Sequence, residues 1–171
     1  MRRLRKSLNS FLLGKIYVSY IQPVLDYAVA IWGHCTENNK ALIKRIQHRA
    51  ARIVTGQFDY VNIRGQNLMT QLGWQSIDQR RDYYTSCLMY HGVNDLAPMH
   101  INNEISLVSE MHEARTRSAT NRNVCIPKPN VELYKKSFRY HGSVTWNALP
   151  DELKLAPDQR GFKDLYKHLF F

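Results

Sequence analysis

The amino-acid sequence predicts a mainly α protein: a helical bundle followed by a small α+β C-terminal region with a short hairpin or strand pair. Apolar residues recur at helical spacing through most of residues 1–98 and again through 159–171. Between them, prolines and partial alternation of apolar and polar residues favour short strands. We therefore divide the chain into a helical region (1–98), a polar linker or loop (99–123) and the α+β region (124–171).

The composition indicates one globular domain, or slightly more, with an acidic partner. The chain has 171 residues, 44% of them hydrophobic, and a net charge of +10. Such a charge favours nucleic acid as the partner ahead of an anionic membrane surface. The three cysteines are far apart in the sequence, which indicates neither a zinc knuckle nor a disulfide framework. Reduced thiols are typical of the cytoplasm or nucleus, so we expect an intracellular protein.

No segment has the length and apolar character of a membrane span. The basic N-terminus followed by apolar residues only loosely imitates a signal peptide, because Lys15 and Asp26 interrupt the apolar run. A span needs about 20 consecutive apolar residues, and no such stretch is free of polar residues or proline. We expect no membrane partner.

Two buried helices are predicted first, over residues 7–20 and from Pro23 to Gly33, since proline is tolerated in a first helical turn. A third helix follows over residues 38–56, with an asparagine at its start and Gly56 at its end. Short helices are expected over 63–72 and 76–92. Ser76 and Gln79 have the spacing of a capping box at the start of the second of these.

The later elements are less regular. Residues 99–123 are polar, and those around Thr116 and Asn121 predict an exposed loop. Val124 to Ile126, bounded by prolines, reads as an edge strand. We interpret the first half of residues 134–149 as a strand and the second half as a helical turn. We expect a helix start at Asp151 and a last helix over 159–171.

The helix over 38–56 carries the clearest functional pattern. Its expected apolar side consists of Leu42, Ile43, Ile46, Ala50, Ile53 and Val54. Its opposite side carries Lys40, Lys44, Arg45, Arg49 and Arg52 and no acid. One interpretation is an ordinary amphipathic helix with a basic outer face, and the other is a helix that lies against a phosphate backbone. Arg80 and Arg81 are either an exposed pair or a second backbone contact.

Catalytic motifs are missing from the sequence. There is no glycine-rich phosphate loop, no nucleophile elbow and no His-Glu-x-x-His pattern, and the seven histidines are scattered. A polymerase or nuclease needs converging carboxylates to hold metal ions, and no aspartate pair stands in a hydrophobic strand. We expect a protein that is not an enzyme on its own, with no cofactor, no metal and no small-molecule substrate. Phe138 and Trp146 are expected in a small core, with stacking on unpaired bases as the alternative.

Several short motifs occur in an order that resembles a known family. They are Ile21-Gln-Pro-Val-Leu-Asp-Tyr27 with Trp32-Gly33, Ile46-Gln47, Arg49-Ala-Ala-Arg-Ile53, Leu72-Gly-Trp74, Arg80-Arg81 and Trp146-Asn-Ala-Leu-Pro150. Together they resemble the segment that follows the palm in reverse transcriptases of non-LTR (LINE-type, jockey-like) retrotransposons. His91 is a departure, since relatives usually have lysine there.

The resemblance implies a helical, thumb-like region that grips the template–primer duplex beside a catalytic palm. The palm aspartates are expected upstream of Met1, so the chain would be a non-catalytic C-terminal fragment of an RNA-directed DNA polymerase. The candidate nucleic-acid-binding residues are Lys40, Lys44, Arg45, Arg49, Arg52, Arg80 and Arg81. They would contact the RNA or DNA backbone without reading its sequence.

Two alternatives remain open at this point. Residues 7–32 could present apolar helices that self-associate or dock on the palm and fingers of an intact reverse transcriptase. The chain could also be a pseudogene product with no function.

Overall fold

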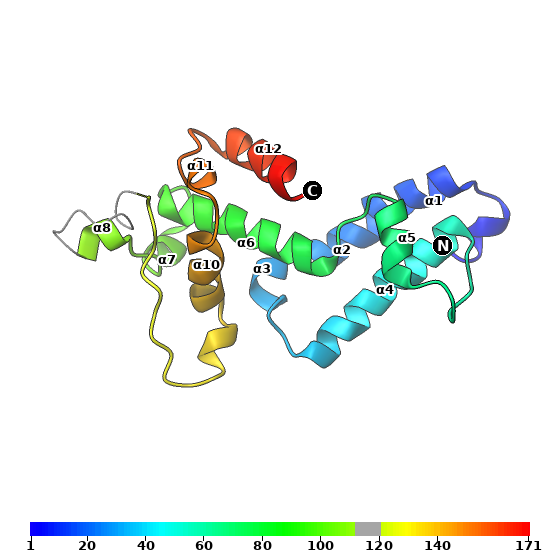
Figure 1. The fold of residues 1–171 in the computed structure, drawn as a ribbon, viewed down its shortest axis with the longest axis horizontal. Helices are drawn as coiled ribbons and strands as arrows, with labels where there is room; N and C mark the ends of the chain where they lie inside the picture. The colour runs from blue at the N-terminus through cyan, green and yellow to red at the C-terminus, as the bar shows by residue number, and fades with distance from the viewer. Residues whose placement is uncertain (112–120) are drawn as a thin grey trace. The chain divides into compact units, whose positions relative to one another are not determined.

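The computed structural model describes residues 1–111 and 121–171 and is mainly helical (Figure 1). The chain forms two compact units. Unit 1 comprises Met1–Val29 and Cys35–Arg81, and unit 2 comprises Ala30–His34 and Asp82–Phe171. Within the described ranges, none of the helices combines the length and the apolar character needed to cross a bilayer.

Unit 1 begins with a continuous helical segment rather than two separate helices. Pro23 has no N–H to donate to the carbonyl of Ser19, and a wide π-helical turn lies directly before it. Ala28 adopts a left-handed conformation and separates this segment from the next helix. The elements in chain order are η1 (Leu4–Lys6), α1 (Ser10–Ile16), η2 (Tyr17–Ile21), α2 (Gln22–Asp26), α3 (Val29–Trp32), α4 (Glu37–Thr55), α5 (Gly65–Gln71) and α6 (Ile77–Val93).

Local signals placed the ends of several helices correctly. Gly56 has a φ of 82° and ends α4 in the left-handed conformation that glycine adopts without strain. Ser76 and Gln79 form the predicted capping box: the Ser76 N–H donates to Gln79 Oε1 at 2.9 Å, and the Gln79 N–H donates to Ser76 Oγ at 3.2 Å. These ends depend on neighbouring residues alone, which explains why the sequence reveals them.

The buried face of α4 matches the predicted one only in part, at Ala50 and Val54. α4 packs against α1 and α5 (Figure 1), and its buried residues are Gln47, Ala50, Ala51, Arg52 and Val54. Leu42 and Ile46, which we expected on the apolar side, are 55% and 45% exposed. The two alanines have the smallest side chains on the helix and allow the neighbouring backbones to come close. The true buried face is therefore rotated from the predicted side toward Gln47 and Ala51.

Polar and aromatic side chains from the recognisable motifs join the parts of unit 1. The Tyr17 and Trp74 rings stack with centroids 4.0 Å apart. Gln47 Oε1 accepts the Ile77 N–H at 3.1 Å. Arg80 binds Asp26 through two nitrogens, with Arg80 Nε 2.6 Å from Asp26 Oδ1. The motif residues Asp26, Gln47, Trp74 and Arg80 therefore stabilise the fold of unit 1.

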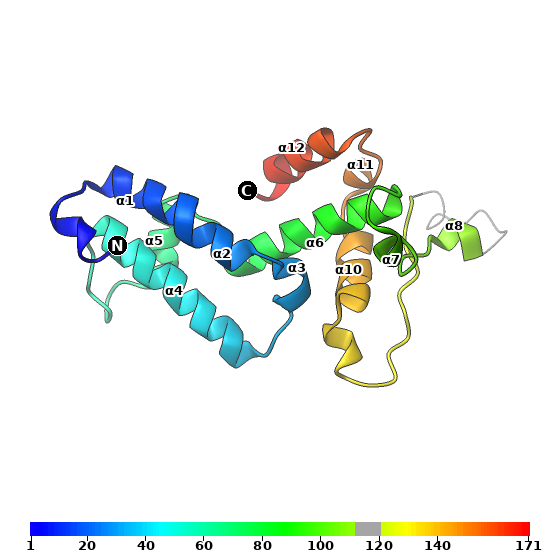
Figure 2. The ribbon, with the colours of Figure 1, turned by 180° about the vertical axis from the view of Figure 1, so that it is seen from behind.

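Unit 2 is built around the later part of α6. Figure 2 shows α10 and α11 beside this part of α6. Trp146, Phe162 and Leu153 are fully buried in the core, together with Met89 and Tyr90 of α6. The remaining elements are α7 (Met99–Asn102), α8 (Val108–Met111), η3 (Tyr134–Lys136), α10 (Phe138–Asn147), α11 (Asp151–Lys154) and α12 (Gln159–Phe170).

The predicted hairpin or strand pair is not supported. Among the described residues, the only β pairing is an isolated bridge between Leu107 and Val124. The backbone groups of Val124 bond instead to the side chain of Asn147. The Val124 N–H donates to Asn147 Oδ1, and Asn147 Nδ2 donates to the Val124 carbonyl, both at 2.9 Å. An amide side chain thus takes the place of a partner strand.

Residues 138–147 are helical where a strand was expected over the first half of 134–149. Ser137 accepts a hydrogen bond from the Tyr140 N–H and caps the helix, a local signal that the partial alternation concealed. Trp146 packs into the core, as the core interpretation predicted. The predicted loop residues 112–120 lie outside the described residues.

The compact units divide at Arg81, inside α6, instead of after Pro98. Met89, Tyr90 and Val93 belong to the same core as Trp146, so the second half of α6 joins the C-terminal elements. Ile105 and Leu107, from the predicted linker, also pack against this core. Tertiary packing across long sequence distances sets this division, and composition along the chain does not reveal it.

Two buried acidic groups in unit 2 predict a pH dependence of stability. Burial raises the pKa of the Cys87 thiol from 9.0 to about 11 and that of the Tyr166 hydroxyl from 10.0 to about 12. In the unfolded chain these groups ionise at lower pH, which favours unfolding. The free energy of unfolding should therefore fall as pH rises from 9.0 toward about 11. Urea unfolding followed across this range should show a shallower decline in Cys87→Ala, and an identical decline would contradict the assignment.

Candidate nucleic-acid interface

Positive charge is concentrated in unit 1. Unit 1 contains 13 of the chain's 24 lysines and arginines but only four of its 14 aspartates and glutamates. Its net charge is therefore +9 of the chain's total of +10, and unit 2 is almost neutral. A charge imbalance confined to one compact unit is the electrostatic pattern expected of a surface that receives a polyanion.

All four acids of unit 1 are engaged by the fold. Lys40 pairs with Glu37 at 2.7 Å, and Arg80 pairs with Asp26. Asp78 receives two of the predicted cations, Lys44 at 2.6 Å and Arg81 at 3.0 Å. The fourth acid, Asp59, accepts the N–H groups of its own loop from Val61 and Asn62, both at 2.9 Å.

These contacts affect four of the seven candidate binding residues. Burial raises the pKa of Asp78, but the Lys44 hydrogen bond and nearby cations outweigh it, so the net pKa lies below its usual value. Asp78 is therefore charged at neutral pH and is shared by Lys44 and Arg81, so one positive charge of this group remains. Lys40 and Arg80 are each balanced by their own acid.

Arg52 lies inside the fold and not on the outer face of α4. Only 5% of the residue is exposed. Its guanidinium donates to the carbonyls of Asp59 at 2.7 Å and Ile63 at 2.5 Å, with a longer bond to Gln57 at 3.5 Å. Arg52 therefore stabilises the loop after α4. We predicted that it would face solvent, and that prediction is wrong.

Arg45 and Arg49 are the candidate residues that remain open to solvent. They lie one turn apart on the exposed side of α4. Neither side chain has a hydrogen bond or ion pair with any residue in the described part of the chain. Two arginines four residues apart repel each other by about a few tenths of a kcal/mol, which an anion bound between them would relieve.

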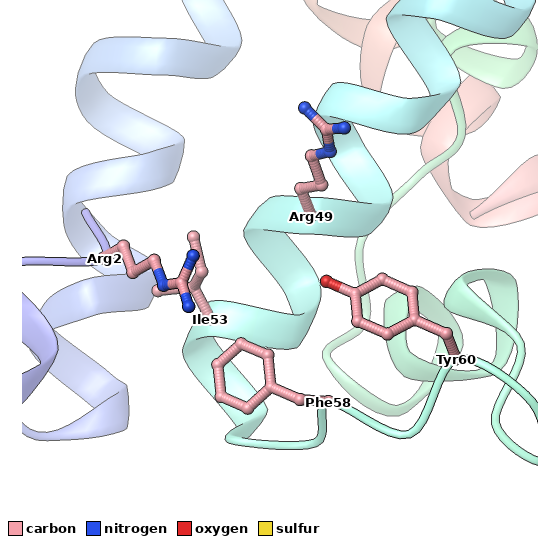
Figure 3. Close-up of a pocket in the computed structure, with 5 residues that line it drawn as sticks. All are labelled: Arg2, Arg49, Ile53, Phe58 and Tyr60. Atoms are coloured by element: carbon pink, nitrogen blue, oxygen red, sulfur yellow. The ribbon is translucent and has the colours of Figure 1, made fainter.

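An open pocket adjoins Arg49. It has a volume of about 560 Å³ and is lined by Arg2, Arg49, Ile53, Phe58 and Tyr60. Figure 3 shows Arg49 and Ile53 projecting from α4, with Phe58 and Tyr60 on the segment that follows it. Phe58 and Tyr60 were not among the predicted binding residues. Two aromatic residues that closely follow the arginines of α4 were the signal in the sequence that could have indicated this site.

Across residues 1–111 and 121–171, no three His, Cys, Asp or Glu side chains gather as a metal site. His34 and His141 stack in unit 2 with ring centroids 3.7 Å apart, as part of the packing there. Comparisons of the chain with models of protein families, with curated proteins and with solved structures found no match.

Proposed function

We propose that the chain is a non-catalytic nucleic-acid-binding segment, related to the region after the palm in non-LTR retrotransposon reverse transcriptases. In this proposal unit 1 grips the sugar–phosphate backbone of an RNA–DNA duplex. The observation that carries the proposal is the +9 charge of unit 1, with Arg45 and Arg49 open to solvent at its surface.

The ion pairs within unit 1 indicate which of its cations are available to bind phosphate. Lys40, Lys44, Arg80 and Arg81 share three acid partners, which leaves this group a net charge of only +1. Arg45 and Arg49 have none among the described residues, and exposed Arg2 and Arg3 lie in the same unit. Guanidinium groups hold phosphate through paired hydrogen bonds, which suits a grip on the backbone without base recognition.

Replacing Arg45 and Arg49 together with glutamate is expected to weaken binding to an RNA–DNA duplex by at least about tenfold. The two substitutions remove two phosphate contacts and add two repulsive charges. Fluorescence polarisation with a labelled duplex at several salt concentrations measures the effect. The slope of log affinity against log salt should also become shallower by about two, since each phosphate contact contributes about 0.9.

A charge-matched control separates the surface from the total charge. Arg160 and Lys167 are exposed on α12 in unit 2, and reversing both changes the net charge by the same amount. This double variant should retain most of the affinity. Equal losses in the two double variants would remove α4 from the mechanism, because total charge alone would then explain binding.

A second candidate function follows from the apolar surface of the first helical segment. Tyr20 and Val24 are 74% and 73% exposed, and Phe11 is also largely exposed. Exposed apolar side chains on one segment are typical of a protein-interaction surface. Association through this surface would persist at high salt, whereas backbone binding weakens steeply. Sedimentation of the chain at low and high salt, with and without duplex, distinguishes the two functions.

A further inference from the structure

The pocket beside α4 contains the two kinds of group that bind an unpaired nucleotide. Arg2 and Arg49 supply guanidinium groups, and Phe58 and Tyr60 supply aromatic rings. No carboxylate of residues 1–111 or 121–171 lines the pocket. Its volume of about 560 Å³ lies within the range of about 300–1,000 Å³ that is usual for small-ligand sites.

The two rings are held in position by arginines from elsewhere in unit 1. The Arg52 guanidinium carbon lies 4.3 Å from the centroid of the Tyr60 ring. The corresponding carbon of Arg5 lies 5.4 Å from the centroid of Phe58, and Arg5 also donates to the carbonyl of Ile53. Cation–π contacts of this kind restrict the motion of each ring. Tyr60 nevertheless remains 67% exposed and Phe58 43% exposed, so both rings retain surface for a ligand.

The loop that presents the rings is organised by polar contacts within the chain. Arg52 binds the carbonyls on both sides of Tyr60, those of Asp59 and Ile63. The Asp59 carboxylate accepts the N–H groups of Val61 and Asn62 and an amide hydrogen of Asn62. The one acid of this loop is therefore turned to its own backbone, and its charge is not aimed into the pocket.

Base pairing decides which form of nucleic acid suits such a pocket. In a duplex the bases are stacked inside the helix, and only the phosphates reach a flat basic surface. An unpaired base exposes its faces and stacks on aromatic side chains while arginines hold its phosphate. An acidic peptide would use the arginines but would leave the two rings without a stacking partner.

We propose that this pocket binds an unpaired nucleotide of a single-stranded segment that adjoins the duplex held by Arg45 and Arg49. The inference rests on the proposed backbone-binding function and adds a preference for a junction between double and single strands. Tyr60 and Phe58 stack on the base, and Arg49 and Arg2 hold the adjacent phosphate. Stacking on any base is possible, so no strong sequence preference follows.

Fluorescence polarisation of the full chain with two probes tests the inference. One probe is a blunt RNA–DNA duplex, and the other is the same duplex with a single-stranded overhang. The overhang should improve affinity by about tenfold, in line with the strength of base–aromatic stacking. Tyr60→Leu and Phe58→Leu should each reduce this advantage while leaving blunt-duplex affinity unchanged. Tyr20→Leu, an exposed tyrosine outside the pocket, should keep the advantage.

A measurement on the unmodified chain avoids any effect of mutation on folding. An overhang containing 2-aminopurine should lose fluorescence on binding, because stacking on an aromatic ring quenches it. Equal affinity for both probes without quenching would refute nucleotide binding in the pocket but would still support duplex binding by Arg45 and Arg49. Failure to bind either probe would overturn the grip itself. A competition experiment compares polyglutamate with single-stranded RNA. If polyglutamate abolishes the extra affinity for the overhang as readily as single-stranded RNA does, the pocket binds acidic polypeptides instead.

Discussion

Replacing Arg52 with methionine is expected to lower the free energy of unfolding by about 2–4 kcal/mol. Arg52 is 5% exposed, and its guanidinium donates to the carbonyls of Asp59 and Ile63. Methionine fills a similar length of space but offers no donor, so these carbonyls lose their charged partner. Urea unfolding of the full chain measures the loss. Hydrogen exchange of residues 57–63 should increase more than that of the rest of unit 1.

Arg45→Met provides the matched control for Arg52→Met. The two positions lie on the same helix, and the substitution is identical, but Arg45 is exposed. Its replacement should change stability by no more than about 0.5 kcal/mol. Arg52→Lys should recover only part of the loss, because a single ammonium cannot reproduce the spread of a guanidinium across several carbonyls. Equal stability of the Arg52→Met and Arg45→Met variants would refute a structural role for Arg52.

Trp146→Ala is expected to destabilise unit 2 by about 3–5 kcal/mol. The Trp146 side chain is fully buried, and it packs with Tyr90 and Phe162 in the core of unit 2. Its indole N–H donates to the carbonyl of Arg122 at 2.9 Å. Alanine leaves a large cavity and an unpaired carbonyl. Hydrogen exchange across residues 82–111 and 121–171 should report the loss of protection.

One further variant separates the hydrogen bond of Trp146 from its packing, and a second serves as a control. Trp146→Phe keeps an aromatic ring in the core but removes the hydrogen bond to Arg122, so its cost should be smaller. Val144→Ala, at a more exposed position of α10, should have little effect. Equal stability of the Trp146→Ala and Val144→Ala variants would contradict the core role of Trp146.

Helix ends were the most predictable part of the fold. Gly56, the Ser76–Gln79 capping box and the start of the last helix at Asp158 all depend on residues within one turn of each other. The strand interpretation of residues 134–142 was wrong because the alternation there was only partial. Ser137 supplied a cap that favours the helix instead.

The sequence predicted a basic helix as the candidate site, but it did not predict which of its cations are exposed. The basic character of residues 40–52 is plain in the sequence, and Arg45 and Arg49 do lie exposed on α4. Arg52 differs because the loop after α4 folds over it. Lys44 and Arg81 differ because both reach Asp78, more than 30 residues from Lys44 in the chain. The Asp78–Arg81 spacing on α6 is a local pattern, but no pattern within a single helix reveals the pairing of Lys44 with Asp78.

Composition and local periodicity were sufficient to establish a mainly helical, strongly basic chain and to place several of its helix boundaries. They were sufficient because backbone hydrogen bonds and caps act between residues that are near in sequence. Which cations stay open to solvent depended on contacts between distant segments, such as Asp26 with Arg80 and Arg52 with its loop. Burial and ion pairing are properties of the packed molecule. The sequence named Arg45 and Arg49 among seven candidates, but only the structure singled them out and added the pocket with Tyr60.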